Sequence, residues 1–121
     1  MADDKTVVAE LRARVEAFVA ARDWRQFHAP KNLAMALSCE AAELLEHYLW
    51  VEAASSQQVT DDPARRAKIE GELADIAICL LNLCNVLGVD LSAALEKKLA
   101  EADAKYPADK VRGQAKKYDE Y

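Results

Sequence analysis

Apolar residues recur at helical spacing along most of this chain, and very little interrupts them. The 121 residues contain only three glycines and three prolines, while 52% are hydrophobic and 31% are charged. Ala, Leu, Glu and Lys dominate, and this composition favours long helices over many short strands. The sequence therefore predicts an all-α fold in a single compact domain.

The apolar period and the helix-end signals together predict four helices. Their expected ranges are 6–21, 31–50, 63–87 and 91–105. An aspartate caps a helix well and a proline opens one, so Asp61-Asp62-Pro63 marks the start of the third helix, which is expected to end at Gly88. This helix is apolar nearly all round between Leu73 and Leu81. It is therefore expected to be the buried centre of a four-helix bundle.

Polar residues mark the remaining boundaries. Asp4 or Thr6 is available to cap the first helix, and Asp90 to cap the fourth. Residues 22–30 break the helical period and predict a structured connection before the second helix. The bundle is expected over residues 1–107, while the polar tail 108–121 is predicted to be a short helix, an arm that covers a partner, or a frayed end.

Charge, size and cysteine content exclude several classes of protein. A net charge of −5 argues against binding to nucleic-acid polymers, which requires clustered Lys and Arg. Cys39, Cys79 and Cys84 are odd in number and lie in apolar helical patterns, as reduced cytoplasmic thiols do. The acidic start predicts no signal or transit peptide, and the apolar runs are too short to cross a membrane. So small a core favours completion by a homodimer or homotetramer.

Two pairs of acidic residues lie inside apolar helical stretches. Glu40 and Glu43 are three apart on the second helix, and Glu72 and Asp75 are three apart on the third, so each pair projects from one helical face. Carboxylates that face one another in a partly dry bundle need protons, basic partners or cations. An all-oxygen ligand set favours Mg²⁺, or Mn²⁺, over zinc. The simpler interpretation is that these are surface acids with chance spacing.

Four ordered blocks make the chain resemble a known family. They are residues 22–33, Glu40-x-x-Glu43 followed by Trp50, Glu72-x-x-Asp75, and Lys105-Tyr106-Pro107. This arrangement is similar to that of the MazG-like all-α nucleoside triphosphate pyrophosphohydrolases, particularly the branch that contains the dCTP pyrophosphatases. The resemblance spans residues 22–107 and implies the helical bundle of that family.

The resemblance also implies a reaction at the acidic residues. Glu40, Glu43, Glu72 and Asp75 would ligate Mg²⁺, which would neutralise triphosphate charge during phosphoryl transfer. Nucleoside triphosphate and water would give the monophosphate and pyrophosphate, with Glu40 or Glu43 as general base. The implied role is house-cleaning of deoxynucleoside triphosphates, with a preference for dCTP or modified pyrimidines.

Contacts to the substrate are implied in the same way. Trp24 and Trp50 would form an aromatic wall for the base, with His28 nearby, because stacking on indole suits a flat pyrimidine. Polar contacts are implied for Lys31 and Asn32, and an approach to the triphosphate is implied for Lys98, Lys105 and Tyr106. The simpler interpretations are core or interface packing for the tryptophans and a solvated helix end for the lysines of the fourth helix.

Three positions depart from the pattern of the dCTP-preferring relatives. Val15 stands where those relatives have a histidine that contacts the base, Cys79 where a tyrosine is expected, and Ala102 where an asparagine is expected. The implied reaction survives these changes. The preferred base and sugar stay open.

Other classes of protein remain as alternatives. An all-α dUTPase or a phosphoribosyl-ATP pyrophosphohydrolase shares the carboxylate chemistry but differs in its base pocket. A di-iron carboxylate bundle usually uses Glu-x-x-His pairs, and neither His28 nor His47 follows a glutamate at that spacing. A non-catalytic helical adaptor would keep the bundle without activity, and the intact acidic pairs count against it.

Overall fold

A computed structural model describes residues 1–121, and all its regular elements are helical. The α-helices are α1 (Val8–Ala20), α2 (Pro30–Glu46), α3 (Pro63–Leu87), α4 (Leu91–Lys105) and α5 (Ala108–Val111). Three 3-10 helices accompany them: η1 (Arg25–Phe27), η2 (Ala53–Asp61) and η3 (Tyr118–Glu120). The all-α prediction is thus confirmed. The chain divides into two compact units, Met1–Gly88 and Val89–Tyr121.

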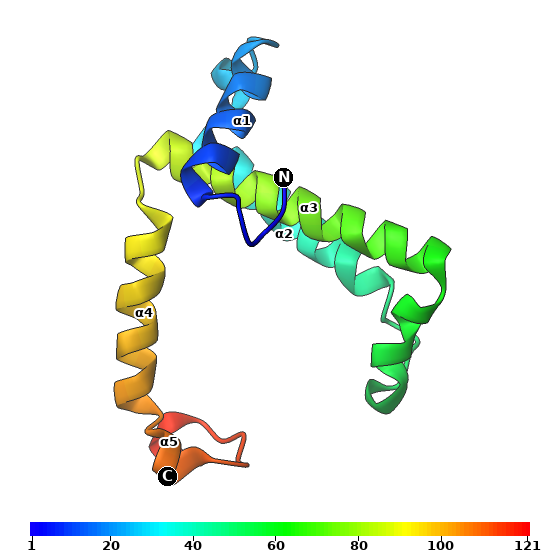
Figure 1. The fold of residues 1–121 in the computed structure, drawn as a ribbon, viewed down its shortest axis with the longest axis vertical. Helices are drawn as coiled ribbons and strands as arrows, with labels where there is room; N and C mark the ends of the chain where they lie inside the picture. Colours follow the sequence, from blue (N-terminus) through cyan, green and yellow to red (C-terminus); the bar gives the residue numbers. More distant parts are fainter. The chain divides into compact units, whose positions relative to one another are not determined.

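Helix α3 organises the first unit. It lies beside α2, which runs in the opposite direction, and it also contacts α1 and η2 (Figure 1). The small core draws on all four elements. Its buried apolar side chains are Val19, Leu33, Val59, Ile69, Leu81 and Cys84. The core therefore sits along the contacts that α3 makes with its neighbours.

The expectation that α3 is buried all round is only partly met. Leu73 and Ile78 keep 51% and 46% of their surface exposed. Helices α1 and α2 and the 3-10 helix η2 all contact α3, yet these two side chains stay open to solvent. The bundle is thus incomplete within the first unit.

Local signals set most of the helix ends. Asp62 caps α3 by accepting a hydrogen bond from the Ala64 N–H at 3.1 Å, and Pro63 is its first residue. Gly88 ends α3 in the left-handed region, with φ +65°, which a residue without Cβ adopts at little cost. Asp90 caps α4 by accepting from the Ala93 N–H at 2.9 Å. These three predictions are confirmed.

Two predicted helix ends are wrong. Neither Asp4 nor Thr6 caps α1, because the N-cap is Val7 without a side-chain hydrogen bond. Helix α2 ends at Glu46 rather than near Trp50. The N–H groups of His47 and Tyr48 donate three residues back, to Leu44 and Leu45, so the helix tightens into turns.

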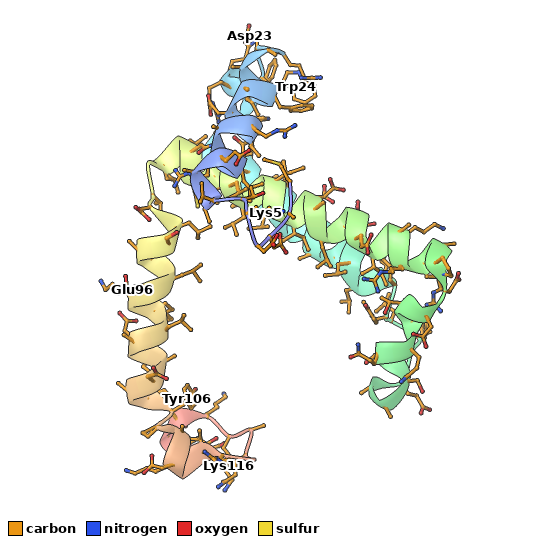
Figure 2. The ribbon with its side chains drawn as sticks, viewed as in Figure 1. Lys5, Asp23, Trp24, Glu96, Tyr106 and Lys116 are labelled. Atoms are coloured by element: carbon orange, nitrogen blue, oxygen red, sulfur yellow. The ribbon has the colours of Figure 1, made fainter.

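The second unit consists of α4 and the folded tail. The ring of Tyr106 meets the rings of Tyr118 and Tyr121 edge to face, with centroids 6.4 and 6.3 Å apart. The Tyr121 hydroxyl accepts from the Lys116 N–H at 3.1 Å, and Figure 2 shows Lys116 and Tyr106 at the same end of α4. The tail thus includes the short helix that was one of its predicted forms.

No single helix is both long and apolar enough to cross a membrane, and only α3 and α4 taken together reach that length and composition. All three cysteines are free, as expected for reduced thiols.

Candidate metal centre and nucleotide site

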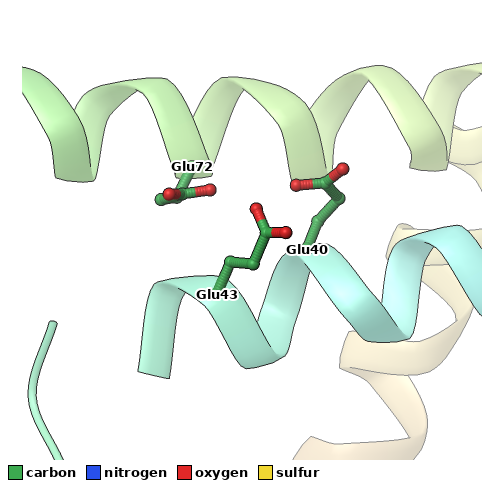
Figure 3. A group of neighbouring side chains, drawn as sticks. All are labelled: Glu40, Glu43 and Glu72. Carbon is green, nitrogen blue, oxygen red and sulfur yellow. The ribbon is translucent and has the colours of Figure 1, made fainter. Parts of the chain in front are cut away.

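Three carboxylates converge between α2 and α3. Glu40 and Glu43 come from successive turns of α2, and Glu72 comes from the facing side of α3 (Figure 3). One oxygen from each of the three carboxylates lies within 4.8 Å of the corresponding oxygens of the other two. Side-by-side packing of the two helices therefore joins residues that are distant in sequence into one acidic cluster, named here the Glu40–Glu43–Glu72 cluster.

The electrostatics of this cluster favour a bound cation. The charge of Glu40, and then that of Glu72, raises the pKa of Glu43 above its ordinary range. Glu40 Oε2 is buried and has no hydrogen-bond partner. A buried carboxylate oxygen is costly without a donor or a cation. The oxygen-only set fits a hard divalent ion such as Mg²⁺ or Mn²⁺.

Asp75 lies one turn beyond Glu72 on α3 and is exposed. It is outside the three-carboxylate cluster but shares a neighbour with it. Burial raises the pKa of the Cys79 thiol, and the charges of Glu40 and Asp75 raise it further. The charges of Glu40 and Asp75 therefore act on the same thiol.

His47 contacts the cluster and was not among the predicted site residues. Its Nε2 lies 3.4 Å from Glu72 Oε1. The signal was present in the sequence, because His47 follows Glu40 and Glu43 by seven and four residues and so shares their helical face.

A polar network fixes the connection between α1 and α2. Asn82 is 96% buried on α3, and its Oδ1 accepts a hydrogen bond from Arg25 Nη1 at 2.8 Å. Arg25 also pairs with Glu16. Because a guanidinium can only donate, the Asn82 Nδ2 is the group that faces His28 Nδ1, at 3.1 Å. An accepting Nδ1 leaves the ring proton of His28 on Nε2.

Neither Arg25 nor Asn82 was among the predicted site residues. The available signal was an asparagine inside the apolar run Leu80-Leu81-Asn82-Leu83. A buried amide in such a run needs partners.

The two tryptophans have different surroundings within the chain, and their joint role as a wall for the base stays a prediction. Trp24 follows α1 (Figure 2), and its ring meets Phe18 edge to face at 5.8 Å between centroids. Arg22 lies over the Phe18 ring, 3.7 Å from its centroid. Trp50 is 95% exposed. Its ring is thus free to meet a ligand or another chain.

The remaining predicted contacts are spread over both units. Lys31 is exposed in the first turn of α2, and Asn32 uses its Nδ2 to donate to the Phe27 carbonyl at 3.1 Å. Lys98 pairs with Glu101 on α4 at 3.5 Å. Lys105 Nζ lies 5.1 Å from the centroid of the Tyr118 ring. The approach of Lys98, Lys105 and Tyr106 to a triphosphate stays a prediction.

Two surface hollows lie in the first unit. The larger, about 590 Å³, includes Leu45, Tyr48, Gln57 and Thr60 in its lining but no predicted site residue. The smaller, about 290 Å³, is lined by Arg14, Val15, Phe18 and Ile78. Ile78 follows Asp75 by three residues on α3, so the lining of the smaller hollow includes a residue one helical turn from Asp75.

Comparison with known proteins settles the family. A model of the MazG-like family matches residues 35–121, a range that contains both acidic pairs. The chain belongs to the MazG-like family. The match begins after the 22–33 block and extends through the tail. The prediction of this family from four sequence blocks is confirmed.

Individual relatives of the chain support the same assignment. The chain is 40% identical over 101 residues to dCTP pyrophosphatase 1 of Rattus norvegicus and 38% identical over 103 residues to that of Homo sapiens. These matches cover 84% and 85% of this chain but 59% and 61% of the relatives. The chain thus spans about three fifths of the length of the curated relatives it matches.

The fold comparison agrees. The crystal structure of a pyrophosphatase from Archaeoglobus fulgidus DSM 4304 is similar, with a TM-score of 0.77 and 36% identity. The match covers 82% of this chain and 91% of that chain. The MazG-like all-α fold is therefore confirmed.

Proposed function

We propose that this chain is a divalent-metal-dependent nucleoside triphosphate pyrophosphohydrolase, which converts a nucleoside or deoxynucleoside triphosphate and water to the monophosphate and pyrophosphate. The observation that carries this proposal is the Glu40–Glu43–Glu72 cluster between α2 and α3. The relatives named as dCTP pyrophosphatase and the structural neighbour named as a pyrophosphatase support the same reaction class.

The carboxylates fit Mg²⁺, with Mn²⁺ as a substitute. Glu40 offers a buried oxygen without a partner, and Glu43 and Glu72 offer oxygens close by. Asp75 is proposed as the fourth ligand because it shares Cys79 with Glu40 as an electrostatic neighbour. When bound, the ion neutralises charge on the triphosphate and on the departing pyrophosphate.

The chain's own residues supply the proton chemistry and the binding contacts. One carboxylate of Glu40 and Glu43 is proposed to accept a proton from the water that attacks the α-phosphorus. A raised pKa, as Glu43 has, makes a carboxylate a better proton acceptor. Lys98, Lys105 and Tyr106 are proposed to contact the triphosphate.

The proposed substrate is dCTP or a modified pyrimidine deoxynucleotide. Trp24 and the exposed Trp50 offer rings for stacking, and His28 offers a ring whose proton is on Nε2. Lys31 and Asn32 are proposed to add polar contacts. The hollow lined by Val15 and Phe18 gives an apolar surface for the base near the acidic residues. dUTP and phosphoribosyl-ATP remain the competing substrates.

A homodimer or homotetramer is proposed as the working form. Leu73 and Ile78 of α3 are about half exposed, and Leu95 and Leu99 of α4 are more than half exposed. A second copy would bury such surfaces and would bring further residues to the site. Three free cysteines fit a reducing compartment, so the cytoplasm is the proposed location.

A substrate panel tests the function. Purified chain is incubated with canonical and modified deoxynucleoside triphosphates, with and without Mg²⁺, and products are separated by ion exchange. Metal-dependent release of monophosphate and pyrophosphate is expected, fastest with dCTP or a modified pyrimidine. Glu72→Gln is expected to lose activity, whereas the neighbouring Glu70→Gln keeps it. No turnover of any triphosphate would favour the adaptor.

A further inference from the structure

The acidic cluster has one nitrogen donor in contact with it. His47 Nε2 lies 3.4 Å from Glu72 Oε1, and both side chains are 20% exposed. We propose that His47 is a positioning residue that orients the Glu72 carboxylate for metal binding. The inference rests on the proposed metal role of the cluster and assigns a function to a residue outside its ligands.

The helical face of α2 continues from the carboxylates to this imidazole. Glu40, Glu43 and His47 follow one another at intervals of three and four residues, which places them along one side of the helix. That side faces α3, since Glu72 lies opposite (Figure 3). His47 is at the end of the row, where α2 stops.

The main chain of His47 is also held. Its carbonyl accepts a hydrogen bond from Arg65 Nη2 at 3.3 Å, and its N–H donates to the Leu44 carbonyl at 3.2 Å. Arg65 and Glu72 both belong to α3 and are two turns apart. Helix α3 therefore contacts both the backbone and the ring of His47. These contacts hold the imidazole in place beside Glu72.

The carboxylates of the cluster differ in what satisfies them. Glu40 Oε2 is buried without a partner, and a hydrogen-bond donor or a cation would satisfy it. Glu72 has His47 on Oε1, and a carboxylate that accepts one donor keeps its second oxygen available. The 3.4 Å separation is longer than that of an ordinary hydrogen bond.

Donors of this kind normally fix ligand geometry. Removing a hydrogen-bonding partner of a metal ligand typically weakens metal binding by about 10–100-fold. Glutamine carries an amide nitrogen at a reach close to that of histidine Nε2, so it preserves a donor toward Glu72, whereas alanine removes it.

Mn²⁺ binding to the metal-free chain tests the proposal. Free Mn²⁺ is followed by electron paramagnetic resonance during titration of wild type, His47→Ala, His47→Gln and Glu46→Gln. His47→Ala is expected to bind at least about 10-fold more weakly, while His47→Gln stays close to wild type. Glu46→Gln, an exposed acid beside His47, is the matched control and should also stay close to wild type.

Activity supplies a second readout. His47→Ala should raise the Mg²⁺ concentration for half-maximal activity, while kcat at saturating Mg²⁺ stays near that of wild type. Equal Mn²⁺ affinity in His47→Ala and wild type would overturn the proposal, and so would a His47→Gln variant as weak as His47→Ala. If the wild type hydrolyses no nucleotide but the expected order of Mn²⁺ affinities holds, positioning stands and the proposed enzymatic function fails.

Discussion

Glu43 lies beside two other carboxylates, and its affinity for a proton reflects their charge. Glu40 and Glu72 together raise the pKa of Glu43 above 4.5, its ordinary value. Without a metal, this repulsion opposes folding at neutral pH. As pH falls, the folded chain therefore takes up a proton at Glu43 at a higher pH than the unfolded chain does. The loss of folding stability caused by the repulsion disappears as pH falls through the raised pKa.

The variant Glu43→Gln tests this coupling, because it removes one of the repelling charges. With metal chelated, it is expected to have a higher Tm than wild type at pH 7. The difference in Tm between the two proteins should shrink as pH falls toward 4.5. Adding Mg²⁺ should reverse the order at pH 7, because only wild type keeps all the ligands. Thermal unfolding by circular dichroism measures both effects. Equal Tm values at pH 7 in chelator would contradict the repulsion.

Trp50 is the other residue whose environment predicts a clear result. Its 95% exposed ring contributes little to packing, so Trp50→Ala should leave Tm unchanged. Stacking of a base on an aromatic ring is worth about 1–3 kcal/mol, so KM for the preferred triphosphate should rise on the order of 10-fold. Steady-state kinetics check this, with the exposed neighbour Leu49→Ala as control. A lower Tm with unchanged KM would show instead that Trp50 packs in the assembly.

At the scale of elements, the pairing of α2 with α3 brings together the Glu40–Glu43–Glu72 cluster, which is the proposed metal site. The two helices run side by side, so each turn of one meets a defined turn of the other (Figure 1). The end of α3 at Gly88 and its start at Asp62 determine its length. The stability of α3 should therefore respond to backbone changes within it and at its end.

The glycines of α3 provide a matched pair for this test. A Cβ added at Gly71 or at Gly88 would meet nothing within 4 Å, so only backbone conformation separates the two sites. Gly71 is inside the helix, and Gly71→Ala should stabilise the chain by roughly 0.5–1 kcal/mol. Gly88 has φ +65°, and Gly88→Ala should destabilise it by about 1 kcal/mol or more. Urea unfolding measures the free energy of unfolding of both variants. If both variants changed it in the same direction, this account would be contradicted.

At the scale of the whole molecule, exposed apolar surface is the dominant feature. Leu73 and Ile78 on α3, and Leu95 and Leu99 on α4, are all about half exposed or more. Each of these side chains is therefore left uncovered by the other helices of its own unit. Large exposed apolar patches are typical of surfaces that bind another protein.

Solution mass tests the oligomer directly. Light scattering during size exclusion should give two or four times the 13.4 kDa of one chain. Leu99→Asp should shift the mass toward that of a single chain, because a buried charge without a partner is costly. Ser92→Asp places the same charge at the start of the same helix and should leave the mass unchanged. A wild-type mass of 13.4 kDa would contradict the proposal.

Local chemistry made most of the fold predictable from sequence. An aspartate cap, a proline at the first position and a glycine at the end each act within a few residues, and they defined the start and end of α3. The spacing of Glu40 and Glu43 likewise determined that they share a face. The family, too, could be recognised from ordered blocks of residues alone.

Tertiary packing decided the rest, because it joins residues that no local pattern relates. The contact of His47 with Glu72 spans 25 positions, and those of Asn82 with His28 and Arg25 span 54 and 57. Whether Glu72 or Asp75 enters the three-carboxylate cluster depends on how α3 is rotated against α2. A pattern within one helix defines a face, whereas the register between two packed helices determines which side chains of those faces meet.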